Sequence, residues 1–212
     1  LVAELTRVTS LAHEAWAKAR ANDDYPAFKP WLRQILDLTL QAAEHLGYAD
    51  RIYDALIDQY EPGMKTAQVA ALFGELKAAQ IPLIQAIAAQ RDRIDNSILK
   101  REYPEAAQEA FGQMVAQQLG YDFEHGRLDR AVHPFTTGFG SKDIRITTRY
   151  EARWLPGSLF GTIHESGHAM YEQGSAAAIS GTPLEGGASL GIHESQSRLW
   201  ENLVGRSRAF WT

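Results

Sequence analysis

The stretch Gly161-Thr162-Ile163-His164-Glu165-Ser166-Gly167-His168-Ala169-Met170 places two histidines four residues apart, with a glutamate directly after the first. Residues four apart on an α-helix lie on the same face, so His164 and His168 can direct two imidazoles at one ion. Glu165 is rotated by about 100° from His164. The flanking residues are small or apolar, which indicates a buried helix whose polar groups need a partner to offset their desolvation. The stretch therefore predicts a buried helix that carries a zinc site.

The same residues predict a chemistry. Zinc polarises a peptide carbonyl and lowers the pKa of a bound water to about 7. Glu165 can reach that water without ligating the ion, take its proton and pass it to the leaving amine. The competing interpretation is a chance match on a solvated helix, which the apolar flanks disfavour. The motif therefore favours a metallopeptidase with Glu165 as general base and His164 and His168 as ligands.

A catalytic zinc site needs a third protein ligand and one open position. The chain has no cysteine, so this ligand must be His, Asp or Glu. The candidates that follow His168 in the sequence are Glu172, Glu185, His193, Glu194 and Glu201. Glu194 opens an amphipathic helix after the Gly-rich stretch 181–191, and Arg198 one turn later can orient its carboxylate. Two alternatives stay open: Glu194 can be an acid favoured by the helix dipole, and His193 can be the ligand instead.

Before Gly120 the chain has the apolar spacing of helices. We expect helices over 1–21, from Pro30 to 47, over 53–60, from Thr66, after Pro82, and over 104–119. The first helix is separated from the second by Asn22-Asp23-Asp24-Tyr25-Pro26.

After Gly120 the pattern changes. Residues 121–142 are aromatic and Gly-rich and are typical of a loop, whereas 143–150 alternate as a strand does. Pro156 and Ser158 open the zinc helix, which ends near Gly174, and a last helix begins near His193. The predicted class is mostly α, a helical metallopeptidase domain with a small β element beside the zinc helix. We take 144–148 as an edge strand that could pair with an extended peptide.

Composition narrows the function. Of 212 residues 45% are apolar and 22% charged, and the net charge is −5. An acidic chain of this kind lacks the basic field that binds nucleic acid. No apolar run approaches the length that spans a membrane, and no signal segment opens the chain, so we expect no membrane partner and a cytoplasmic location. The chain starts at Leu1 within a helical pattern and stops at an aromatic cluster, which suggests a fragment of a longer protein.

Three segments resemble one known family. Gly161-Thr162-Ile163-His164-Glu165-Ser166-Gly167-His168-Ala169-Met170-Tyr171-Glu172-Gln173-Gly174 looks like the zinc helix of the carboxypeptidase Taq family, the thermostable metallocarboxypeptidases. Gly191-Ile192-His193-Glu194-Ser195-Gln196-Ser197-Arg198-Leu199-Trp200-Glu201-Asn202 resembles its second motif, and His133-Pro134-Phe135-Thr136 resembles its His-Pro-Phe segment. The three occur in the family's order, and the likeness covers essentially the whole chain.

The resemblance implies more than the spacing does. It implies that Glu194 is the third metal ligand, that zinc or cobalt is the metal, and that single C-terminal residues are removed from peptides with broad specificity by a homodimer. Apart from the resemblance, His193 beside Glu194 and His133 in the aromatic loop are possible residues of the substrate groove, with packing and loop rigidity as the alternative for His133. Residues 1–212 would be a single fragment of a larger domain, with a helical part at 1–120 and a zinc-site part at 121–212. The family's later motifs, which hold the substrate carboxylate, would lie beyond Thr212, so the fragment alone is expected to be a poor enzyme.

Two other functions are compatible with the same residues. One is a zinc endopeptidase or oligopeptidase with the same metal site, which would not require a free C-terminus. The other is a non-catalytic helical metal-binding domain, whose structural zinc would have four protein ligands and no bound water.

Overall fold

The computed structural model describes residues 1–212, which form two compact units, Leu1–Gln80 and Ile81–Thr212. None of the helices combines the length and the apolar character that crossing a bilayer requires.

The first unit is entirely helical. It contains α1 (Val2–Ala21), α2 (Tyr25–Leu46), α3 (Ile52–Ile57) and the start of α4 (Thr66–Ala88). α1 packs against α2, and α2 against α3. The buried contacts are made mostly by small side chains such as Ala12, Ala43 and Ala55, which let the helices approach closely.

Three prolines occupy positions in helices that differ from those expected from the sequence. The second helix begins at Tyr25, so Pro26 occupies its first turn and Pro30 lies inside the helix. Asp24 caps this start, because its side chain accepts a hydrogen bond from the Ala27 N–H at 3.1 Å. Pro82 was expected to open a new helix, but α4 continues through it. A proline usually breaks a helix, yet a kinked helix can continue past it, and the sequence alone does not distinguish the two.

The second unit contains the motif helix and a small sheet. Its elements are α5 (Glu105–Leu119), β1 (Leu128–Arg130), β2 (Thr136–Gly138), β3 (Ile144–Thr148), α6 (Leu155–Gln173) and α7 (Leu190–Arg198), followed by a π-helical turn, η5 (Leu199–Val204). The strand order is β1-β3-β2, with β1 parallel and β2 antiparallel to β3. Short 3-10 turns occupy parts of the connections.

The sheet corrects two expectations. The segment 121–142 is not all loop, since it contains β1 and β2. Each has three residues, too few for an alternating pattern to be recognised. The strand at 144–148 was taken as an edge strand, but β3 is paired on both sides and is the central one. The strand with a free edge beside the motif helix is β2.

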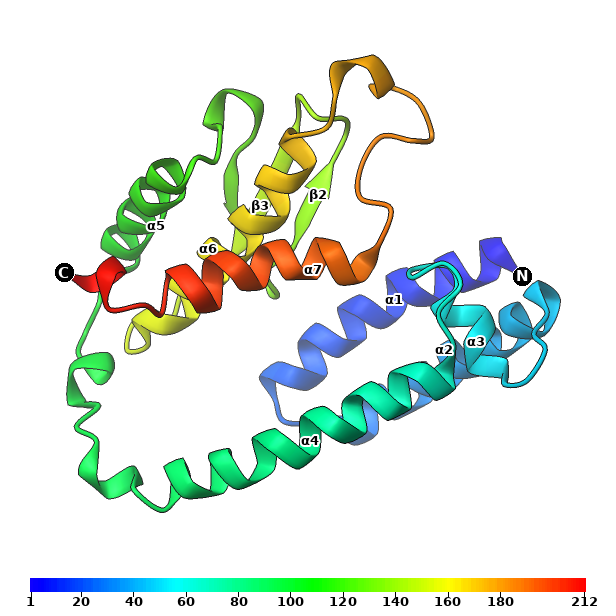
Figure 1. The fold of residues 1–212 in the computed structure, drawn as a ribbon, viewed down its shortest axis with the longest axis horizontal. Coiled ribbons are helices and arrows are strands. Elements are labelled where there is room, and N and C mark those ends of the chain that lie inside the picture. Colours follow the sequence, from blue (N-terminus) through cyan, green and yellow to red (C-terminus); the bar gives the residue numbers. More distant parts are fainter. The chain divides into compact units, whose positions relative to one another are not determined.

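The core of this unit surrounds α6, which packs against α5, α7 and β3 (Figure 1). Leu159 and Ile163 are buried with Val115 of α5, and Ala169 is buried with Ile146 of β3. The prediction of a mostly helical fold with a small sheet beside the motif helix is confirmed. Because α6 is held on several sides, its polar face is fixed relative to α7 and β2.

Candidate metal centre

The motif residues lie on α6 as expected from their spacing. Pro156 is in the first turn of this helix, where its missing N–H costs nothing. His164 and His168 lie one turn apart, with ring centroids 4.9 Å apart and planes at 81°. Their side chains are 19% and 14% exposed, so both rings are largely shielded but open on one side.

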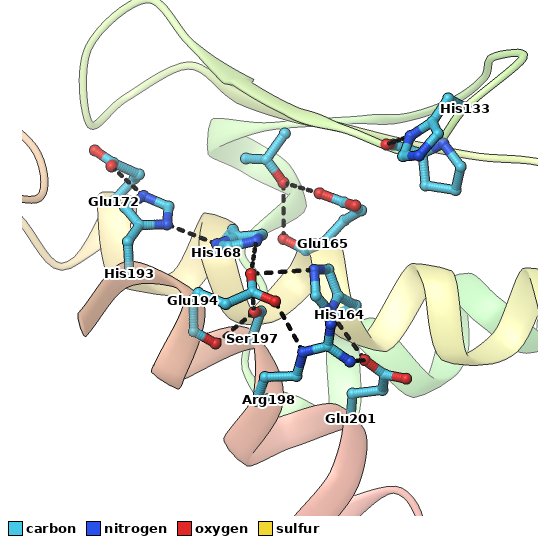
Figure 2. A network of polar contacts seen from close by, with 12 residues as sticks. His133, His164, Glu165, His168, Glu172, His193, Glu194, Ser197, Arg198 and Glu201 are labelled. Carbon is cyan, nitrogen blue, oxygen red and sulfur yellow. Dashed lines mark hydrogen bonds and ion pairs between the residues drawn. The ribbon is translucent and has the colours of Figure 1, made fainter. Parts of the chain in front are cut away.

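Glu194 of α7 completes a cluster with the two histidines (Figure 2). Its Oε2 lies 3.2 Å from His168 Nε2 and 3.6 Å from His164 Nε2. The approach of α7 to α6 depends on Gly167, where a Cβ would lie 2.6 Å from Ser197 Cα and 2.9 Å from the Gln196 carbonyl oxygen. The glycine inside the motif therefore lets the two helices come close enough for Glu194 to reach the histidines.

The donor atoms fit a divalent ion. Zinc binds His nitrogen and carboxylate oxygen at 2.0–2.2 Å, so two donors of a tetrahedral site lie about 3.3–3.6 Å apart. The two measured distances from Glu194 Oε2 fall in or close to this range, and all three donor atoms lie within 4.8 Å of one another. Two imidazoles and a carboxylate, with no thiolate, suit zinc and other borderline divalent metals.

The charges of the donors also suit a cation. Burial lowers the pKa of His168 to about 4, helped by the neighbouring rings of His164 and His193, so its lone pair is available at neutral pH. Burial acts to raise the pKa of Glu194, but donation from Arg198 and Ser197 outweighs it and holds that pKa below its ordinary value. The cluster thus combines a neutral imidazole with an ionised carboxylate.

Glu165 lies on the same helix but is held by the sheet. Thr136 of β2 donates its hydroxyl to Glu165 Oε2 at 2.7 Å, and the same hydroxyl lies 3.1 Å from the Glu165 carbonyl oxygen. Burial raises the pKa of Glu165 above its ordinary value, while the Thr136 donation opposes this rise. Thr136 ends the segment that resembles the family's His-Pro-Phe motif, but no role of its own was predicted for it from the sequence.

A cavity of about 740 Å³ opens beside the cluster. Both Glu165 and His168 line it, together with β2 and the loop that precedes α7. Glu185 holds that loop, since it accepts hydrogen bonds from the backbone N–H groups of Ser141 at 2.8 Å and Gly181 at 2.6 Å. This glutamate was a candidate ligand and is instead engaged in the loop.

The other candidate residues lie around the cluster rather than in it. Glu201 of η5 accepts from His164 Nδ1 at 2.9 Å, and His193 has both ring nitrogens on protein partners, His168 and Glu172. His133 lies on the exposed segment between β1 and β2, with its Nδ1 against the Pro134 carbonyl, and does not line the cavity. Phe135, two residues later, does line it.

A buried helix with H-E-x-x-H, joined by a carboxylate from the next helix, defines a centre of the metallopeptidase class. Comparison with known proteins then gives the family. The family model described as "Carboxypeptidase Taq (M32) metallopeptidase" matches residues 1–212. The chain belongs to the carboxypeptidase Taq (M32) metallopeptidase family.

Comparison with individual relatives supports the same family assignment. The chain is 43% identical over 209 residues to "Carboxypeptidase 1" of Bacillus subtilis (strain 168), and 45% identical over 221 residues to "Thermostable carboxypeptidase 1" of Thermus thermophilus. These alignments cover 99% and 100% of this chain, but 42% and 43% of the relatives. The solved M32 carboxypeptidase from Deinococcus radiodurans R1 is 45% identical, with a TM-score of 0.85 over 99% of this chain and 42% of that one. The chain therefore spans less than half the length of the relatives it matches.

Proposed function

We propose that this protein is a metal-dependent carboxypeptidase that removes single C-terminal residues from peptides with broad specificity. The observation that carries the proposal is the donor cluster of His164, His168 and Glu194 beside a cavity, in a chain whose relatives are named carboxypeptidases. The exopeptidase character comes from those relatives, and the hydrolytic chemistry comes from the residues.

In this proposal His164, His168 and Glu194 hold zinc, with cobalt as an alternative. A divalent ion bound there supplies Lewis acidity, which polarises a peptide carbonyl and makes a water molecule more acidic. Glu165 accepts the proton of the attacking water as the water oxygen bonds to the carbonyl carbon. Glu165 then delivers that proton to the amine nitrogen as the C–N bond breaks. The hydroxyl of Thr136, on Oε2, holds the carboxylate in place through both steps.

The free edge of β2 supports binding of an extended peptide. The Thr147 N–H bonds to the Phe135 carbonyl, and the Phe139 N–H to that of Asp143. With this register, the backbone groups of Thr136 and Gly138 face away from β3. Both residues line the cavity. An extended substrate can therefore pair with this edge, and its scissile bond would lie next to Glu165. The homodimer and the cytoplasmic location expected from the sequence stay predictions.

The test compares peptides that have a free C-terminus with the same peptides amidated. The zinc-loaded full-length protein should shorten the free peptides by one residue at a time, as followed by mass spectrometry, and spare the amidated ones. Internal cleavage of amidated peptides would instead favour the endopeptidase. Zinc held without cleavage of either set would favour a non-catalytic domain.

Glu165→Gln tests the general base within the same assay. Glutamine keeps the shape but cannot take up the proton, so the rate should fall by about 10²–10⁴-fold, the usual contribution of general-base catalysis. Zinc content, measured by atomic emission, should stay at one ion per chain. His164→Ala is the contrasting variant and should lose the metal. Normal turnover by Glu165→Gln at full zinc content would remove Glu165 from this role.

A further inference from the structure

The ring of His193 connects one candidate ligand to a carboxylate (Figure 2). Its Nδ1 lies 2.6 Å from His168 Nδ1, and its Nε2 lies 2.6 Å from Glu172 Oε1. The side chains of His193 and Glu172 are 20% and 22% exposed, and both line the cavity beside the cluster. The sequence left His193 as a ligand or a groove residue, but both of its ring nitrogens contact protein partners, so neither is directed at the cluster as a donor.

Only one arrangement of protons satisfies every contact when His168 Nε2 faces the cluster as a lone pair. The Nδ1 of His168 then carries the proton and donates to His193 Nδ1. His193 must accept there, so its own proton is on Nε2 and is donated to Glu172. Each of the two rings is left with a single neutral tautomer.

The ring of His193 is also held against rotation. It packs against His168, with centroids 4.6 Å apart, and against the edge of Tyr171 at 5.2 Å and 87°. On a further side lies Gly187, where a Cβ would come within 2.7 Å of His193 Cδ2 and 2.9 Å of Tyr171 Cε1. The backbone at Gly187 therefore closes one side of the ring, while His168 and Tyr171 contact two others.

We propose that His193 and Glu172 are positioning residues, which orient the His168 ring and hold it in the tautomer that presents Nε2 to the metal. This inference rests on the proposed metal site. The other ligand has a different support: His164 Nδ1 donates directly to Glu201, which Arg206 holds at 2.7 Å and Arg198 at 3.2 Å. One histidine is thus supported by a carboxylate and the other by a carboxylate acting through a second imidazole.

A pair of substitutions at one position separates hydrogen bonding from packing. His193→Asn places its Oδ1 near the place of Nδ1 and can still accept from His168, whereas His193→Leu fills space without an acceptor. In the full chain, zinc affinity measured against a competing chelator should fall about 10–100-fold in His193→Leu, the usual cost of losing such a partner. His193→Asn should recover most of that loss.

The spectroscopic measurement uses the Co²⁺-loaded protein. Each histidine bound through Nε2 gives a shifted, solvent-exchangeable Nδ1–H proton signal, so wild type should show two. His193→Leu should move one signal and speed its exchange with water. Glu201→Gln, the matched control, should move the other alone. Glu172→Leu should move the same signal as His193→Leu, and it carries the test if His193→Leu does not fold.

The outcomes separate this inference from the proposed function. If wild type binds neither zinc nor Co²⁺, the proposed function fails first. If wild type binds zinc but His193→Leu binds it equally well with both signals unchanged, the positioning role is overturned. It is also overturned if His193→Asn is as weak as His193→Leu, since the ring would then act only by filling space.

Discussion

The two oxygens of Glu194 have different partners. Oε1 accepts from Arg198 Nε at 2.8 Å, while Oε2 accepts from Ser197 at 3.0 Å and faces His164 and His168. Arg198 fixes the carboxylate by a bond across one helical turn, which leaves the second oxygen aimed at the histidines. The helix-dipole interpretation of Glu194 does not account for this orientation, because a dipole interaction needs no particular rotamer.

Replacement of Glu194 by alanine should weaken zinc binding at least about 10-fold, since the loss of even a residue that only supports a ligand lowers metal affinity by that much. The variant removes a donor and leaves the two histidines with an incomplete site. Glu109→Ala, an exposed acid on α5, is the control and should bind zinc as wild type does. Chelator competition measures both. Unchanged affinity in Glu194→Ala would transfer the third position to another residue.

At the scale of elements, the contact between α6 and α7 decides whether the site can form. α6 contributes two donors and α7 one, and neither helix carries a complete set. The π-helical turn η5 follows α7 directly and brings Glu201 to the far side of His164. π-helical turns are frequent at functional sites, where they redirect side chains that a regular helix would place elsewhere.

Gly167→Ala should separate the two helices. The added Cβ meets backbone atoms of Gln196 and Ser197, which cannot rotate away, so α7 must shift. Overpacking of this kind costs about 1–3 kcal/mol of stability. Zinc affinity should fall as well, because Glu194 moves with α7.

The control for this prediction is Gly74→Ala on α4, where a Cβ would meet no atom within 4 Å. This change should raise stability by about 0.5–1 kcal/mol, the usual gain from replacing a helical glycine with alanine. Thermal unfolding and chelator competition report the two effects. Wild-type zinc affinity in Gly167→Ala would mean that α7 is free to adjust without moving Glu194.

At the scale of the whole molecule, every candidate donor and each of its hydrogen-bonding partners belongs to the unit 81–212. The unit 1–80 contributes helices with small buried residues and none of the donors. Ligand binding stabilises the segments that must be intact for the ligand to bind. Metal is therefore expected to stabilise the two units to different extents.

Hydrogen exchange with and without zinc should show this difference. Protection should increase in α6 and α7 and stay unchanged in α1, α2 and α3. His164→Ala, which lacks a ligand, should show no zinc-dependent change anywhere. An equal gain in both units would mean that they open together as one cooperative body.

The prolines and the short strands show where prediction from the sequence ends. The class of fold followed from the apolar spacing, and α1, α5 and α6 have nearly the predicted bounds. The helix at Pro82 continues through the proline instead of starting after it, and β1 and β2 were not predicted. Three-residue strands exist only because β3 lies between them, so their pairing is a long-range property with no local signal.

The spacing of His164 and His168 was sufficient to predict a shared helical face, with Glu165 rotated away from it, because helical periodicity depends only on bonds between near neighbours. The choice of the third donor was different, since spacing alone left Glu172, Glu185, His193, Glu194 and Glu201 open and only the resemblance to the family favoured Glu194. Only the crossing of α6 and α7 at Gly167 places Glu194 on the two histidines and leaves the others to partners around them. That crossing is set by packing between residues distant in sequence, which is why tertiary structure had to decide it.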